Sequence, residues 1–347
     1  MEKQRNPYFD ILKAISIILV IVGHCIQYGA GMDYLRSGIF LYNPLFIFIY
    51  SFHMPLFMII SGYLFGYSCK NKSENQLFTS KIKQLLIPLF CWSFINLFIQ
   101  IIKVWAGIST NPITFIWMCQ TVFSGFIHGP WFLWAIWWSS LVVIIGRRFF
   151  KDNLLFYLLI CLLTLVIPDK NNTAVYKFML PFFLAAYLFN SYDYKTKFKK
   201  LCNSKLLAIL FGVLFVILLR YYNFDSYIYT SGYCILGKDI WWQLNNNLFR
   251  FFIGMFGSIS VMYLVYFLTN QRQNAVINFF GNIGQKTLGI YLISNYIFDE
   301  LLKRLPILGL NYWYVLIEAI SILLVSILIT TILKRFKTTN RLLLGGR

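Results

Sequence analysis

The stretch that decides the fold class is ILKAISIILVIVGHCIQ, residues 11–27. A helix of about 20 apolar residues crosses the hydrocarbon core of a bilayer, and this run approaches that length. It ends in His24, Cys25 and Gln27 rather than in the small residues of a cleavage site, and further apolar runs follow it. No cleavable signal peptide is apparent, and we predict a permanent transmembrane helix.

Nine further apolar runs follow, separated by short polar or basic loops. The fifth and sixth runs are short and also fit a shallow helical hairpin, which leaves the direction of the others unchanged. None of the runs alternates as a β-barrel strand must. We predict an all-α, polytopic transmembrane helix bundle of about ten spans; after the first, these are residues 45–67, 85–103, 131–146, 154–167, 176–190, 206–221, 248–268, 288–302 and 313–333.

The composition supports a membrane protein. The 347 residues are 59% hydrophobic and 12% charged, and a water-soluble domain of this size cannot bury so much apolar surface. The net charge of +19 does not point to nucleic acid, because the basic residues lie between the apolar runs. The seven cysteines form no C-x-x-C pair, so we expect no metal site. Without repeats or linkers, residues 1–347 are predicted to form a single domain.

The distribution of Lys and Arg predicts the orientation, because cytoplasmic segments retain positive charge. Most of the 31 basic residues fall before the first run, after the last, or in loops of the same parity. We therefore predict that both termini are cytoplasmic. The basic residues of the opposite parity are Arg36, Lys103, Lys170, Lys177, Arg220, Lys238, Arg250, Lys303 and Arg304.

The three histidines, His24, His53 and His128, fall in the outer half of the membrane under this topology, and Glu318 falls in the same layer. Titratable groups within a bilayer are costly and mark functional sites. A single intramembrane histidine also fits a plain interhelical hydrogen bond. Their convergence on one layer favours the functional interpretation.

Lys13 and His24 are eleven residues apart in the first run. Eleven residues make three helical turns plus about 20°, so both side chains lie on one face, about 16 Å apart along the axis. With this spacing, Lys13 and other cytoplasmic cations can bind the phosphates of an extended donor while the reactive end of the donor reaches His24. A snorkelling lysine, paired with Asp10 at the helix start, is the alternative.

The second run contains Phe52-His53-Met54-Pro55-Leu56-Phe57 and then Ser61-Gly62-Tyr63. Proline and glycine interrupt a transmembrane helix where neighbouring groups or a cavity satisfy the freed backbone. The pattern fits a polar pocket beside His53, and it also fits a simple kink.

Several motifs, in this order along most of the chain, resemble acyltransferase family 3. They are Phe9-Asp10-x-x-Lys13-x10-His24; Phe52-His53-Met54-Pro55-Leu56-Phe57-x3-Ser61-Gly62-Tyr63; Lys81-x-Lys83-x4-Pro88; Gly129-Pro130-Trp131-Phe132-Leu133-Trp134; and Gly281-x5-Thr287-Leu288-Gly289-Ile290-Tyr291-Leu292. Each motif is weak by itself, but together they make a coincidental match improbable.

The resemblance implies a multi-pass cell-membrane enzyme that transfers an acyl group, usually acetyl from acetyl-CoA. The implied acceptors are hydroxyls of surface polysaccharides or lipid-linked sugars, and the chain looks closest to fucose O-acetylase-like and O-antigen-acetylase-like members. Where many members have Arg, this chain has Lys13. Where the family often has a histidine after Ile-Tyr-Leu, this chain has Ser294, which concentrates acid and base chemistry on His24 and His53.

An acyl transfer needs a base for the acceptor hydroxyl, and imidazole suits that task. His24 is the first choice, either as the base for direct attack or as a transient acyl carrier, with His53 assisting. Lys13, Lys81 and Lys83 are predicted to bind the CoA phosphates. His128, Trp131, Ser294 and Glu318 complete the predicted acceptor-binding set. A transporter or flippase is the main alternative, and a polysaccharide polymerase is another.

Overall fold

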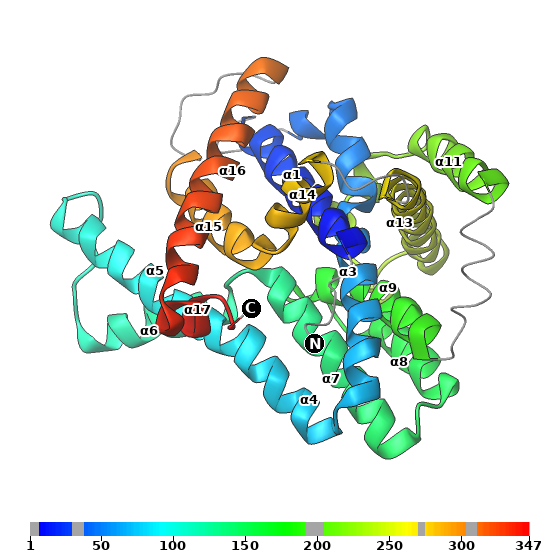
Figure 1. The fold of residues 1–347 in the computed structure, drawn as a ribbon, viewed down its shortest axis with the longest axis horizontal. Helices are drawn as coiled ribbons and strands as arrows, with labels where there is room; N and C mark the ends of the chain where they lie inside the picture. Colours follow the sequence, from blue (N-terminus) through cyan, green and yellow to red (C-terminus); the bar gives the residue numbers. More distant parts are fainter. Residues whose placement is uncertain (1–6, 30–37, 192–204, 270–274, 303–310, 347) are drawn as a thin grey trace.

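The computed structural model describes residues 7–29, 38–191, 205–269, 275–302 and 311–346. Over these residues the chain is helical and contains no strand, which confirms the all-α bundle (Figure 1). The helices are α1 (Pro7–Gly29), η1 (Ile39–Tyr42), α3 (Pro44–Asn71), α4 (Glu74–Lys81), η2 (Ile82–Leu86), α5 (Ile87–Trp105), α6 (Phe115–Ile127), α7 (Trp131–Phe150), α8 (Leu154–Val166), α9 (Thr173–Ser191), α11 (Lys205–Leu219), η3 (Phe224–Ser226), α12 (Ile228–Ser231), α13 (Ile240–Thr269), α14 (Ala275–Gly284), α15 (Thr287–Glu300), α16 (Tyr312–Arg335) and α17 (Lys337–Leu343).

Seven helices of the described residues are long and apolar enough to cross a membrane. They are α1, α3, α7, α9, α13, α16 and the continuous helix Glu74–Trp105 that α4, η2 and α5 form together. Three of the predicted runs form shorter helices: α8 has 13 residues, α11 has 15 and α15 has 14. A helix of 15 residues is about 22 Å long, against about 30 Å of hydrocarbon. The apolar helices α6 and α14 were not among the predicted spans.

Helix α1 lies at the centre of the bundle and packs against α3, α13, α14, α15 and α16 (Figure 1). Its closest approach is to α14, where an added Cβ on Gly284 would stand 1.8 Å from the carbonyl oxygen of Asp10. Only glycine permits that backbone contact. The start of α1, which carries Lys13, is therefore held against α14.

Helix α3 is 28 residues long and continues through Pro55. An added Cβ on Gly62 would stand 2.2 Å from the carbonyl oxygen of Phe183 in α9, so these two helices are in backbone contact. Asn190 strengthens the same interface, because its Nδ2 donates to the carbonyl of Tyr63 over 2.6 Å. This packing fixes the face of α3 that carries His53 and Ser61.

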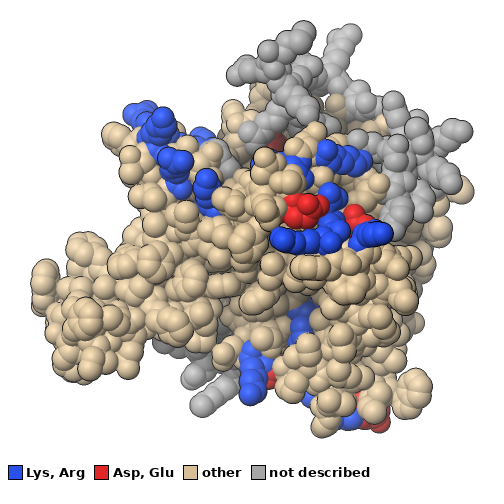
Figure 2. Space-filling model, turned by 90° about the horizontal axis from the view of Figure 1, so that it is seen from below, with Lys and Arg blue, Asp and Glu red and all other residues tan. Residues whose placement is uncertain are grey.

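The outer surface of the bundle is largely apolar, as expected of a multi-pass membrane protein. In Figure 2 charged side chains gather in the upper and central part of the face and in a smaller lower group, and most of the remaining surface is uncharged. The cytoplasmic placement of the two termini stays a prediction. Part of the charge pattern behind it lies outside the described residues, namely Lys3, Arg5, Arg36, Lys195, Lys197, Lys199, Lys200, Arg272, Lys303, Arg304 and Arg347.

Candidate functional site

Two adjoining cavities lie beside α1 in the bundle. The first, here called the lysine cavity, has a volume of about 320 Å³, and its polar lining consists of Lys13, Ser61, Ser68, Lys81, Gln84, Thr287 and Tyr291. The second, the histidine cavity, has a volume of about 250 Å³ and contains both His24 and His53. Val20, Met54 and Tyr291 line both cavities, so the two adjoin at these residues.

Cations from two different helices converge on the lysine cavity. Lys13 on α1 forms an ion pair with Asp10, one helical turn earlier, over 3.2 Å. Lys81 closes α4, and its Nζ lies 4.6 Å from the centre of the Phe65 ring. The π-helix η2 begins at the next residue, and π-helical turns are frequent at functional sites. Gln84 of η2 lines the cavity, while Lys83 is exposed and lines neither cavity.

His53 is buried, with 3% of its surface exposed. Its Nδ1 lies 2.8 Å from the carbonyl oxygen of Ile49, one turn earlier in α3. A carbonyl oxygen only accepts, so Nδ1 carries the proton and Nε2 of the neutral ring keeps its lone pair. Tyr50 packs edge-on against the ring, with 4.8 Å between ring centres.

His24 is oriented by Gln27, one turn later in α1. The Nδ1 of His24 lies 3.0 Å from Oε1 of Gln27. Because an amide oxygen only accepts, this arrangement again puts the proton on Nδ1 and the lone pair on Nε2. The ring packs against both Phe298, 4.8 Å away, and Tyr28, 5.8 Å away. Both histidines therefore have the tautomer of a base.

A loop segment, residues 223–237 and here called the strap, forms one wall of the histidine cavity through Ser226, Tyr227, Ile228 and Tyr229. The side chain of Arg250 on α13 is 2% exposed and forms hydrogen bonds with the backbone of the strap. Its guanidinium donates to the carbonyl oxygens of Asp225 over 2.5 Å, Gly232 over 2.7 Å and Ser226 over 3.0 Å. The strap is thus an ordered wall of the cavity.

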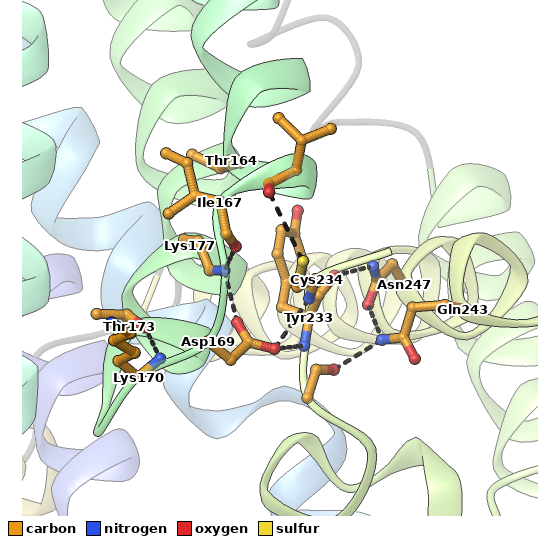
Figure 3. Close-up of polar contacts among 12 residues, drawn as sticks. Thr164, Ile167, Asp169, Lys170, Thr173, Lys177, Tyr233, Cys234, Gln243 and Asn247 are labelled. Carbon is orange, nitrogen blue, oxygen red and sulfur yellow. Dashed lines mark hydrogen bonds and ion pairs between the residues drawn. The ribbon is translucent and has the colours of Figure 1, made fainter. Parts of the chain in front are cut away.

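Asp169 binds the C-terminal part of the strap (Figure 3). Its Oδ2 accepts the backbone N–H groups of Tyr233 over 2.7 Å and Cys234 over 2.9 Å. Its Oδ1 pairs with Lys177 over 2.5 Å. Burial raises the pKa of Asp169, but the donated hydrogen bonds and the Lys177 charge outweigh it and leave this pKa below its ordinary value.

The structure brings together five of the predicted site residues. Lys13 and Lys81 share the lysine cavity, and His24, His53 and Trp131 share the histidine cavity.

Four predicted site residues, including Lys83, lie elsewhere. His128 is exposed at the end of α6. Ser294 is buried and donates to the carbonyl of Tyr291 in its own helix over 3.1 Å, and the next residue, Asn295, lines the cavity instead. Glu318 is half-buried on α16 and lines neither cavity.

Sequence reasoning missed Arg250, Gln27, Tyr227 and Tyr291 as site residues. Arg250 falls within the apolar run 248–268, and the cost of a charge in a bilayer was a signal that could have identified it. Gln27 is one turn from His24 on the same helix face. Tyr227 and Tyr291 reach the site through tertiary packing, which leaves no local pattern.

The chain is similar to an acyltransferase family model and to two nodulation proteins. Residues 6–335 match a family model described as an acyltransferase domain. A nodulation protein NolL from Mesorhizobium japonicum is 24% identical over 358 residues, which covers 99% of this chain and 91% of that protein. A nodulation protein NolL from Sinorhizobium fredii is 34% identical over 190 residues, 53% of this chain and 49% of that protein. No solved structure matches the chain.

Proposed function

The chain belongs to the acyltransferase family that matches its residues 6–335, and we propose that it moves an acetyl group from acetyl-CoA to a carbohydrate hydroxyl. The observation that carries this proposal is that the lysine and histidine cavities adjoin and share Val20, Met54 and Tyr291 as lining residues. A path with cations in one part and imidazoles in the other suits an anionic donor that has a reactive far end. Family membership also favours an enzyme over a transporter, flippase or polymerase.

The lysine cavity is the proposed binding site of the donor. The phosphates of acetyl-CoA are anions, and the ammonium groups of Lys13 and Lys81 attract them as point charges. Ser61, Ser68 and Thr287 add hydroxyl groups to the same lining. With the phosphates beside the lysines, the thioester extends toward Val20 and Met54. The basic residues near the N-terminus of the sequence and along α4 and η2 support a cytoplasmic entrance for the donor.

The histidine cavity is the proposed binding site of the acceptor. Aromatic rings make up much of its lining, and sugar rings stack on such surfaces through their C–H faces. They are accompanied by polar groups that can hydrogen-bond to hydroxyls, among them Asn295 and Ser51. A surface polysaccharide or a lipid-linked sugar in the cell membrane fits this combination. The aromatic residues are Tyr28, Tyr50, Trp131, Phe178, Tyr222, Tyr227, Tyr229 and Tyr291.

The proposed reaction starts with Nε2 of His24, which takes the proton of the acceptor hydroxyl. The hydroxyl oxygen then attacks the thioester carbonyl carbon, a C–O bond forms and the C–S bond breaks. The CoA thiolate leaves and takes up the proton that His24 holds, so the ring returns to its neutral form. His53 assists as the second polar group at the reacting centre. Transient acetylation of His24 gives the same products by two displacements.

The test is acetyl transfer in inside-out membrane vesicles from cells that make the protein, with labelled acetyl-CoA and the endogenous glycans as acceptors. We expect His24→Ala to lower the transfer rate by about 100-fold or more, because a general base contributes that much. His128→Ala is the matched control and should keep the wild-type rate, since His128 is exposed and lines neither cavity. Normal glycan acetylation with altered glycan export in His24→Ala would instead favour the flippase.

A further inference from the structure

We propose that Gln27 is a positioning residue that holds His24 in the tautomer needed for proton abstraction. This inference rests on the proposed role of His24 as the base. Gln27 is 5% exposed, lies three residues after His24 and lines the same cavity. Because this amide is buried, its polar atoms bind other side chains, including the His24 ring, rather than solvent.

The side chain of Gln27 makes three hydrogen bonds. Its Oε1 lies 3.0 Å from Nδ1 of His24 and accepts the hydroxyl of Tyr50 over 3.1 Å. Its Nε2 donates to the hydroxyl oxygen of Tyr227 over 3.3 Å. The amide is therefore tied to α1, to α3 and to the strap, and its oxygen faces the histidine.

The strap that carries Tyr227 is itself anchored. Arg250 donates to the carbonyl oxygens on both sides of this residue, at Ser226 over 3.0 Å and, farther along, at Gly232 over 2.7 Å. The ring of Tyr227 also packs against Tyr50, with 5.7 Å between ring centres. A rigid support of this kind keeps the Gln27 oxygen in place when the acceptor enters the cavity.

The chemical consequence concerns the two nitrogens of His24. When Gln27 accepts a hydrogen bond from Nδ1–H, the lone pair must reside on Nε2, because a neutral imidazole carries one proton. When Nε2 takes the acceptor proton, the ring becomes an imidazolium and the same amide oxygen stabilises its Nδ1–H. Gln27 neither gains nor loses a proton, so it acts through His24 alone.

Other titratable groups face His24 from the helices packed against α1. Helix α14 contributes none, because it contains no Asp, Glu, His, Lys, Arg, Tyr or Cys. Those that line the histidine cavity from α3, α13, α15 and the strap are Tyr50, His53, Arg250, Tyr291, Tyr227 and Tyr229, and Tyr28 and Tyr222 line the same cavity. Glu318 of α16 lines neither cavity and interacts electrostatically with Cys25 of α1. Substitutions at Gln27 leave all of these in place, so a change in pH dependence reports the contact between residues 27 and 24.

The test measures transfer of labelled acetyl from acetyl-CoA to endogenous glycans in membrane vesicles between about pH 5 and 9, a range that brackets histidine titration. Gln27→Glu puts a carboxylate beside the imidazolium and stabilises it. The pH of half-maximal rate should therefore rise by about one unit or more. Gln27→Met removes the acceptor while keeping the volume, and should lower the rate about 10- to 100-fold. Gln120→Glu on the exposed helix α6 is the control and should leave the profile unchanged.

The outcomes distinguish the positioning role of Gln27 from the role of His24 as the base. An unchanged pH profile in Gln27→Glu, together with an inactive His24→Ala, would overturn the positioning role while leaving the base assignment intact. An active His24→Ala would overturn the base assignment itself. If Gln27→Met is absent from the membrane, the profile of Gln27→Glu alone decides. A purely structural role for Gln27 predicts lower protein levels in both variants and no shift of the profile.

Discussion

Replacing Lys81 by Met should weaken donor binding without altering the chemical step. Methionine keeps an unbranched apolar chain over the Phe65 ring, which Lys81 approaches to 4.6 Å, and removes only the charge. Lys81 lines the lysine cavity, while the reacting groups lie in the histidine cavity. The Michaelis constant for acetyl-CoA should therefore rise while the maximal rate stays near the wild-type value.

The size of the effect follows from the environment of the Lys81 ammonium group. Two unit charges about 4 Å apart attract by about 4 kcal/mol near a protein surface. Lys81 is half-buried, so solvent screens part of that attraction, and a hydrogen bond to a charged group contributes about 1.5–3 kcal/mol. The corresponding rise in the Michaelis constant is about 10- to 100-fold.

The assay is the initial rate of acetyl transfer in inside-out vesicles over a range of acetyl-CoA concentrations. Lys83→Met is the matched control, because Lys83 lies two residues later, is exposed and lines neither cavity. Its Michaelis constant should stay near the wild-type value. Equal effects of the two substitutions, or no effect of Lys81→Met, would refute the assignment of the lysine cavity to the donor.

Two further substitutions test the fold around the site. Gly62→Ala puts a Cβ 2.2 Å from the Phe183 carbonyl oxygen, so α3 and α9 must separate by about 1 Å, and the protein should lose about 1–3 kcal/mol or more. At Gly212 an added Cβ meets open space, so Gly212→Ala should leave the thermal midpoint unchanged or raise it. Equal thermal midpoints for Gly62→Ala and Gly212→Ala would contradict the close packing of α3 against α9. Asp169→Asn should loosen the strap and cost about 1–3 kcal/mol at neutral pH. Because the pKa of Asp169 is lowered in the folded protein, its stabilisation is present at neutral pH and is lost on acidification. The difference in thermal midpoint from wild type should therefore close only below about pH 4, and a difference constant with pH would oppose this assignment.

The sequence predicted the parts of the site that follow from position along one helix. Lys13 and His24 lie eleven residues apart, and the structure places them in adjoining cavities along α1. The spans with the strongest apolar character, such as those of α16 and α1, were also predicted. Helix geometry and membrane thickness are local rules, so one sequence suffices to apply them.

Features that depend on tertiary packing could not be predicted in this way. His128 precedes α7 in the sequence and was expected in the histidine layer, but α6 packs back along α5, where Phe126 lies 5.9 Å from Phe90. This turn places His128 on an exposed surface. Lys81 and Lys83 belong to one predicted motif, but residues two apart on a helix point about 200° apart, and packing decides that Lys81 is the one that lines the cavity.

The strap shows a further limit. Residues 223–237 have no strong apolar or helical pattern, and their order comes from Arg250 and Asp169, which are distant in sequence. Hydrogen bonds between buried polar groups depend on which helices adjoin, and that information is spread over the whole chain. The same reason explains why Tyr227 was not recognised as a partner of Gln27.

The central claim, that donor and acceptor meet through one continuous path, is tested most directly by Val20→Trp. Val20 is 3% exposed and lines both cavities, so an indole at this position fills the junction between them. We predict that binding of labelled acetyl-CoA is retained while acetyl transfer to glycans is lost, and that Val216→Trp on the exposed face of α11 changes neither. Transfer at the wild-type rate in Val20→Trp would contradict the account.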